Sequence, residues 1–156
     1  MQLFKIILFI SSISLYKTYT YVDKEINIFK KIEIKKERVL DTFTGPITAY
    51  GPDCKGCIGI TASGYNVKNG NIYYTDKKYG KIRIIAADKT IPFGTIIRIK
   101  ELSLFSEPLL AIVLDRGSAI GFNRKVYIDL LYKNEKETLI FGKREATFEI
   151  LRYGFW

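Results

Sequence analysis

The pattern of apolar and polar positions changes near residue 42. Residues 23–41 alternate apolar and charged side chains without Pro or Gly, a pattern compatible with a solvated linker, an amphipathic helix or an edge strand. From residue 42 onward, short apolar segments are cut by Gly and Pro, which is typical of an all-β domain. The expected strands are Phe43–Tyr50, Lys81–Ala87, Thr95–Lys100, Leu109–Leu114, Val126–Leu131 and Ala146–Tyr153.

Two segments between these strands have their own character. The polar, Tyr-rich stretch from Gly70 to Lys81 predicts an exposed loop. Asn134 and Glu137 resemble a capping box, which predicts a short helix ending near Gly142. About six strands and one short helix favour a small β-barrel over a βαβ sheet.

The start of the chain is apolar. Residues 6–16 are uncharged and mostly apolar behind Lys5, which fits the core of a signal peptide and is short for a membrane span of about 20 residues. No Ala-x-Ala cleavage site follows, so residues 1–22 are either a signal peptide or an uncleaved anchor that tethers the protein through residues 6–16. A buried strand or helix is the alternative. We therefore expect a leader (1–22), a linker (23–41), one domain (42–156), and a secreted or envelope-associated protein.

The composition narrows the chemistry. The chain has 156 residues, 47% of them hydrophobic and 14% aromatic, which is enough for one domain with a real core. Histidine is absent, so Ser-His-Asp and Cys-His catalysis are excluded and the commonest transition-metal ligand is missing. The remaining side chains suit proton transfer by carboxylates.

The net charge is +9, and it comes mostly from scattered lysines. A basic surface attracts polyanions such as nucleic acid, anionic lipid or an anionic cell wall, although an AT-rich genome alone gives the same composition. No helix-turn-helix pattern, aromatic RNA-binding signature or Arg-rich arm is present in the sequence, so we expect no nucleic-acid partner.

Cys54 and Cys57 are the two cysteines of the chain, and alone they cannot complete a four-ligand zinc site. In an exported protein they could close a small disulfide loop, with Gly56 easing the turn. A redox-active Cys-x-x-Cys is less favoured, because such motifs normally open a helix in a βαβ unit. Two free thiols are the remaining alternative.

Three aspartates stand at or beside the ends of apolar runs, where a strand delivers a side chain to the rim of a sheet. Asp88 fits a simple turn cap, because an Asp side chain readily bonds the backbone two residues on. Asp115 fits a cap or a functional group equally well. Asp129 lies inside an apolar run, where an unpaired carboxylate is costly without a purpose.

Several short sequence motifs, taken in their order along the chain, resemble the three-aspartate ("3D") domain family. This family is related to the catalytic barrel of membrane-bound lytic transglycosylase A and to the stationary-phase-survival muralytic proteins. The resemblance covers residues 47–153. Its phrases are Thr48-Ala49-Tyr50, Gly59-Ile60-Thr61-Ala62-Ser63-Gly64, Asp88 with Ile91-Pro92-Phe93-Gly94-Thr95, Asp115-Arg116-Gly117-Ser118-Ala119-Ile120, Ile128-Asp129-Leu130 and Phe141-Gly142-Lys143-Arg144.

The resemblance implies a six-stranded double-psi β-barrel that cleaves the glycan strands of peptidoglycan. It implies that Asp129 is the catalytic acid/base and Asp115 its partner carboxylate. The residues that it places at the substrate groove are Tyr50, Thr61, Asp88, in a mainly supporting role, and Ser118. The chain departs from the family where Arg116 replaces a Thr, where Gly121 replaces a Lys, and where the link between Asp115 and Asp129 is longer.

The implied reaction is a lytic transglycosylation, in which the substrate's own C6 hydroxyl attacks the anomeric carbon. One carboxyl group can therefore act first as acid and then as base, and neither a metal nor an organic cofactor is required. Burial or the charge of Asp115 is expected to raise the pKa of Asp129 from about 3.9. The alternatives are a glycan-binding barrel without activity, as in expansins, and an aspartic-protease-like barrel, which the short chain and the missing Asp-Thr-Gly phrase disfavour.

Overall fold

The computed structural model describes Lys24, Ile26 and residues 37–54 and 56–155. The chain divides into two units, Met1–Glu37 and Arg38–Trp156. The expected leader, with its tether at residues 6–16, and most of the 23–41 segment lie outside the described residues. Among the residues that are described, no helix has the length and apolar character needed to cross a membrane.

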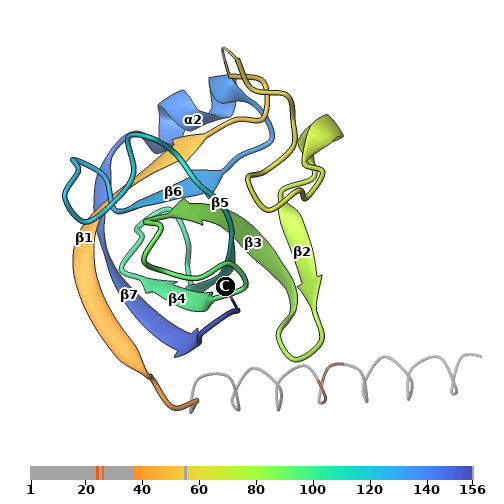
Figure 1. Cartoon of the computed structure of the whole chain (residues 1–156). Helices are drawn as coiled ribbons and strands as arrows, with labels where there is room; N and C mark the ends of the chain where they lie inside the picture. Colours follow the sequence, from red (N-terminus) through yellow and green to blue (C-terminus); the bar gives the residue numbers. More distant parts are fainter. Residues whose placement is uncertain (1–23, 25, 27–36, 55, 156) are drawn as a thin grey trace, which may run out of the picture. The chain divides into compact units, whose positions relative to one another are not determined.

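The second unit is mostly β-structure with one short α-helix (Figure 1). Its strands are β1 (Asp41–Tyr50), β2 (Tyr73–Asp76), β3 (Gly80–Ala87), β4 (Ile96–Lys100), β5 (Leu109–Asp115), β6 (Ile128–Leu131) and β7 (Arg144–Arg152). Its helices are the 3-10 turn η1 (Lys68–Gly70) and α2 (Glu135–Phe141). The strands predicted from the sequence are confirmed, with small shifts at their ends.

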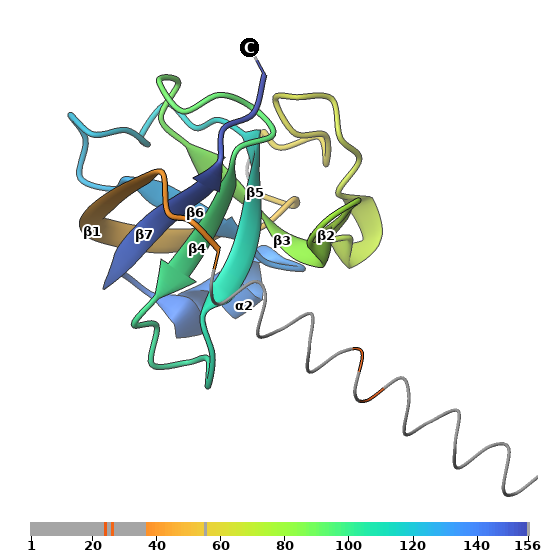
Figure 2. The same ribbon diagram turned by 90° about the horizontal axis from the view of Figure 1, so that it is seen from below.

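The strand pairings close on themselves. The sheet runs in the order β2-β3-β5-β4-β7-β1-β6, and β3 also pairs with β6. All the strands except β2 therefore form a ring around a common interior. β2 lies outside this ring and pairs with β3 (Figure 2). The long strand β1 makes this closure possible, because it pairs with β7 through Asp41–Ile47 and with β6 through Ile47–Tyr50.

Alternation along the strands decides which side chains enter the ring. Successive side chains of a strand point to opposite faces. Ile47, Ile128 and Leu130 are fully buried in the core that fills the interior. Thr48 follows Ile47 on β1, and Asp129 lies between Ile128 and Leu130 on β6. Both side chains therefore point to the outer face of the ring.

The expectation of an exposed loop between Gly70 and Lys81 is wrong. Tyr73–Asp76 forms β2 and pairs antiparallel with β3. The segment is held by Asp76, which is buried and forms an ion pair with Arg152 of β7. An ion pair between segments this far apart in the chain leaves no local sign in the sequence.

The predicted helix is confirmed as α2. Asn134 caps it by accepting a hydrogen bond from the Glu137 N–H (3.0 Å). The Glu137 carboxylate accepts a bond from the Asn134 side-chain amide (3.2 Å). Gly142 ends the helix with a positive φ of 64°, which a residue without Cβ adopts at little cost.

Candidate functional site

A row of four side chains crosses the outer face of the ring. Thr48 of β1 is paired with Asp129 of β6, Asp129 with Ala86 of β3, and Ala86 with Asp115 of β5. Directly paired residues present their side chains on the same face of a sheet. Because neighbouring strands lie about 4.8 Å apart, the Cα atoms of Asp115 and Asp129 lie about 10 Å apart across Ala86. The ring therefore brings two carboxyl groups to one surface.

Asp115 reaches this face through a β-bulge. Ile85 pairs with Val113, but the next residue, Ala86, pairs with Asp115, so Leu114 is an extra residue in β5. Ala111 and Val113 belong to the core, and regular alternation would turn Asp115 to the same inner side. A bulge of this kind re-aims the side chains that follow it. Here it directs the carboxyl group of Asp115 outward.

A cavity of about 480 Å³ lies over the row. Ala86, Asp115 and Asp129 line it from the strands. Its walls come from the disulfide loop, which we define as residues 51–60 and which follows β1, and from the loop after β5. The wall residues include Tyr50, Pro52, Cys54, Cys57, Ile58, Ile60, Ala62, Ser118 and Ile120. The carboxyl groups thus face a hollow with a largely apolar rim.

Asp129 is half-buried and accepts a hydrogen bond from the Thr48 hydroxyl at 2.8 Å. Burial raises the pKa of the Asp129 carboxyl to about 6; the Thr48 hydrogen bond opposes this rise, and the negative charges of Asp115 and Glu135 add to it. The direction predicted from the sequence is confirmed. Near pH 6 this group is protonated about half of the time, as a group that both gives and takes a proton needs to be.

Asp115 has a different environment, because fixed donors hold both of its oxygens. The Tyr50 hydroxyl donates to Oδ2 at 2.7 Å. The backbone N–H groups of Ala62 and Arg116 each donate to Oδ1 at 2.8 Å. Burial and then the charge of Asp115 raise the pKa of Tyr50 well above its usual range, so its hydroxyl remains a donor.

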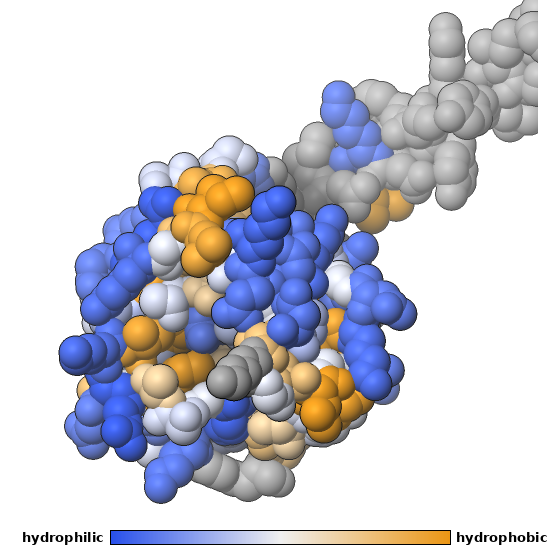
Figure 3. Space-filling view, turned by 90° about the horizontal axis from the view of Figure 1, so that it is seen from above, coloured by the Kyte–Doolittle hydropathy of each residue, from blue (hydrophilic) through white to orange (hydrophobic). Residues whose placement is uncertain are grey.

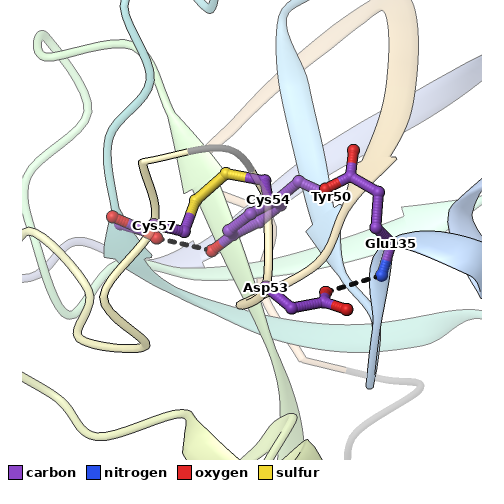
Figure 4. The surroundings of a disulfide bond; sticks show 6 residues. Tyr50, Asp53, Cys54, Cys57 and Glu135 are labelled. Carbon is purple, nitrogen blue, oxygen red and sulfur yellow. Dashed lines mark hydrogen bonds between the residues drawn. A yellow bond between two sulfur atoms is a disulfide. The ribbon is translucent and has the colours of Figure 1, made fainter.

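Cys54 and Cys57 form a disulfide, so neither is a free thiol. Both cysteines line the cavity. The loop is also tied to α2, because the Asp53 carboxylate accepts a bond from the Glu135 N–H at 2.7 Å (Figure 4). In the same view the disulfide lies next to Tyr50. The disulfide loop is therefore a braced wall beside the two carboxyl groups.

Tyr50 and Ser118, two residues expected at a substrate groove, line the cavity, but Thr61 is not among its described lining residues. Thr61 is buried, its hydroxyl accepts a bond from the Tyr65 N–H at 3.0 Å, and its chain neighbours Ile60 and Ala62 line the cavity instead. Its role here is to hold the wall.

Asp88 also lies outside the described lining of the cavity. Its Oδ1 accepts bonds from the Thr90 N–H (2.8 Å) and hydroxyl (2.7 Å), and its Oδ2 accepts one from the Phe122 N–H (3.1 Å). Burial acts to raise the pKa of Asp88, but these hydrogen bonds hold it below the usual value. Asp88 thus fastens its own turn to the long link between β5 and β6.

Arg116, the unusual residue after Asp115, is bound within the protein. Its guanidinium donates to the carbonyl oxygens of Ala87 (3.3 Å) and Ile91 (2.6 Å) and lies 4.1 Å from the ring centroid of Phe93. Arg116 therefore braces the loop that follows β3. Thr48 and Ala86 are site residues that sequence reasoning missed; the Thr48-x-Tyr50 spacing on one strand face was the available signal for Thr48.

No family model matches the chain. The chain is 36% identical over 101 residues to the SPbeta prophage-derived uncharacterized protein YorM of Bacillus subtilis (strain 168), over 64% of this chain and 37% of that protein. It is 30% identical over 105 residues to the Putative cell wall shaping protein YabE of the same organism, over 67% of this chain and 21% of that protein. The chain spans well under half the length of these curated relatives.

Proposed function

We propose that this chain is a peptidoglycan lytic transglycosylase whose catalytic part is a three-aspartate domain over residues 42–156. One observation carries the proposal: Asp115 and Asp129 open into one cavity, and the pKa of Asp129 is raised to about 6. The parallel pairing of β1 with β6 and of β3 with β5 supports a double-psi barrel. The name of the relative YabE supports a role at the cell wall.

The reaction begins with the protonated carboxyl group of Asp129. It donates its proton to the glycosidic oxygen between N-acetylmuramic acid and N-acetylglucosamine as the bond from that oxygen to the anomeric carbon breaks. The C6 hydroxyl of the muramic acid then attacks the anomeric carbon and gives its proton to Asp129. The product is a 1,6-anhydro end, no water is consumed, and Asp129 returns to its protonated form.

Asp115 supplies negative charge where the transition state develops positive charge on the sugar. Its three donors, Tyr50 and two backbone N–H groups, fix the carboxylate in place before the substrate arrives. Fixed charge of this kind needs no reorganisation during the reaction. Tyr50 is therefore a positioning residue, and Asp115 is the group that faces the sugar.

The proposal places the domain outside the cytoplasm, with residues 1–22 as a signal peptide or anchor and residues 23–41 as a linker. The disulfide supports this placement, because such bonds persist in oxidising compartments.

Mass spectrometry of products from purified cell wall tests the activity. We expect 1,6-anhydro muropeptides from the wild-type protein and from the control Asp41→Asn, whose side chain is exposed at the start of β1. Asp129→Asn should keep the fold and release none. Reducing-end products would instead assign a hydrolase. Wall binding without any soluble product would assign a binding barrel.

A further inference from the structure

A second cavity, of about 590 Å³, lies on the disulfide loop. It shares Pro52, Cys57, Ile58 and Gly59 with the cavity over the carboxyl groups. The residues that it does not share come from η1 and from the connection between β6 and α2. The two hollows are therefore neighbours, and one extended ligand can occupy both across the loop.

The second cavity carries more positive charge than the first. Lys68, Asn69, Lys133 and Asn134 line it, and the Asn134 side-chain amide also caps α2. Its one acidic lining residue, Asp53, is already bonded to the Glu135 N–H. The first cavity presents Asp115 and Asp129 beside Arg116, whose guanidinium is bonded to backbone carbonyl oxygens. An anionic group on a ligand is thus attracted more strongly to the second cavity than to the first.

Both lysine stems are packed in place. A Cβ added at Gly59 would lie 2.5 Å from Cγ of Lys68, and one added at Gly70 would lie 3.3 Å from Cγ of Lys133. Both glycines have positive φ, of 70° and 74°, so the close approach of lysine to backbone is built into the loops. A side chain whose stem is held in this way loses less freedom when it binds a ligand.

The apolar contribution comes from Ile58, which is 72% exposed on the shared rim. Figure 3 looks down on the end of the second unit that carries the disulfide loop and α2 in Figure 1, and it shows apolar side chains set among hydrophilic ones. The combination of two lysines, Asn69 and an exposed aliphatic side chain suits a short peptide with a free carboxylate.

We propose that the second cavity is a subsite for the carboxylate-bearing stem peptide that muramic acid carries through its lactyl ether. This inference rests on the proposed function, which places the same sugar in the first cavity. A phosphate linked to O6 of that sugar is the other anionic substituent of a cell wall. It does not fit the reaction, because O6 must be a free hydroxyl in order to attack the anomeric carbon. The subsite makes the protein selective for stem-bearing glycan.

The test compares binding to soluble glycan strands with stems and to the same strands after an amidase has removed them. It is done in the Asp129→Asn background, so the readout is affinity and not cleavage. We expect tighter binding to the stem-bearing strands. Lys68→Gln combined with Lys133→Gln should reduce the ratio of the two affinities about tenfold, the order expected for loss of a charge-assisted contact. The control Lys143→Gln, an exposed lysine outside the cavity, should keep the ratio.

An unchanged ratio in the double variant would overturn the subsite. Loss of the preference after hydrofluoric acid has stripped phosphate-linked polymers from the strands would also overturn it, in favour of a phosphate ligand. Failure of the wild-type protein to form anhydro products would overturn the proposed activity, while a preference for stems that depends on the two lysines would still stand. The two proposals therefore fail separately.

Discussion

Asp129 connects the geometry of the site to a measurable pH dependence. Its carboxyl group must be protonated at the start of the proposed reaction, and its pKa is raised to about 6. We expect kcat/KM for glycan cleavage to fall as the pH rises through about 6. Thr48→Val removes the hydrogen bond that opposes the rise in the pKa of Asp129. The fall in kcat/KM should therefore move to higher pH. A fall that stays in place or moves to lower pH would contradict the assignment.

The same group affects the stability of the fold. The pKa of Asp129 in the folded protein, about 6, lies above its value in the unfolded chain. Between these two pKa values the folded protein binds more protons than the unfolded chain, so its stability falls as the pH rises from the lower value to the higher. At pH 7 the ionised carboxyl group of Asp129 lowers the free energy of unfolding by at most about 3 kcal/mol. Asp129→Asn should therefore increase the free energy of unfolding in urea at pH 7 and have little effect at pH 4. An equal effect at both pH values would point to a cause other than titration.

Tyr50 tests the importance of a fixed Asp115. Tyr50→Phe removes the donor to Oδ2 and leaves the ring in place. We expect kcat to fall about tenfold, because a half-buried acceptor loses its partner, while KM changes little. Tyr74→Phe, a tyrosine on β2 outside the cavity, is the matched control and should behave like the wild-type protein. A larger change in KM than in kcat would assign Tyr50 to substrate binding instead.

At the residue scale, the sequence identified the two carboxylates but not how they come together. The apolar flanks of Asp129 correctly predicted a raised pKa. The outward direction of Asp115 depends on the bulge at Leu114, and no residue type there announces it. Arg116 lines the cavity, and its guanidinium also braces a loop through Ala87 and Ile91. Such contacts are made across the chain and have no local pattern.

At the scale of elements, prediction worked where burial is local and regular. The strands with long apolar runs and the capped helix were found, because alternation and capping are properties of neighbouring residues. β2 was missed because its residues Tyr73–Asp76 read as polar and only Asp76 is buried. Its place depends on Arg152, far along the chain.

The disulfide loop gives a prediction at this scale. Cys54→Ser combined with Cys57→Ser, or reduction of the wild-type protein, should lower the free energy of unfolding by about 2 kcal/mol, the entropy of closing so short a loop. Activity should fall further than this loss of stability explains, because the loop forms one wall of the cavity. Thermal unfolding and wall digestion, each with and without reductant, measure the two effects. Full activity in the double variant would show that the wall keeps its form without the clip.

At the scale of the molecule, the strands of the second unit form a ring that cannot be read from local sequence. Its closure depends on β3, which pairs with β2, β5 and β6. The strand pattern of the residues favoured a small closed arrangement, but it did not give the order or the pairing of the strands. The ring brings Asp115 and Asp129 from separate strands to either side of Ala86.

The net charge of +9 belongs to this scale as well. Long-range attraction between a basic protein and an anionic wall is screened by salt, with a Debye length of about 10 Å at 0.1 M. We expect the affinity for purified anionic wall to fall roughly tenfold or more between 50 and 500 mM NaCl. Binding to uncharged chitin fragments, measured by titration in parallel, should change little. Equal salt sensitivity for both ligands would remove charge as the cause.

The extra residue in β5 also bears on how related chains should be judged. If β5 ran as a regular strand with Leu114 still in it, Leu114 would pair with Ala86 and the carboxyl group of Asp115 would face the inside of the ring. A homologue can therefore retain every aspartate and still lack the pair. Whether Leu114 is accommodated as a bulge, more than the presence of the aspartates, decides whether both carboxyl groups reach the same face of the ring.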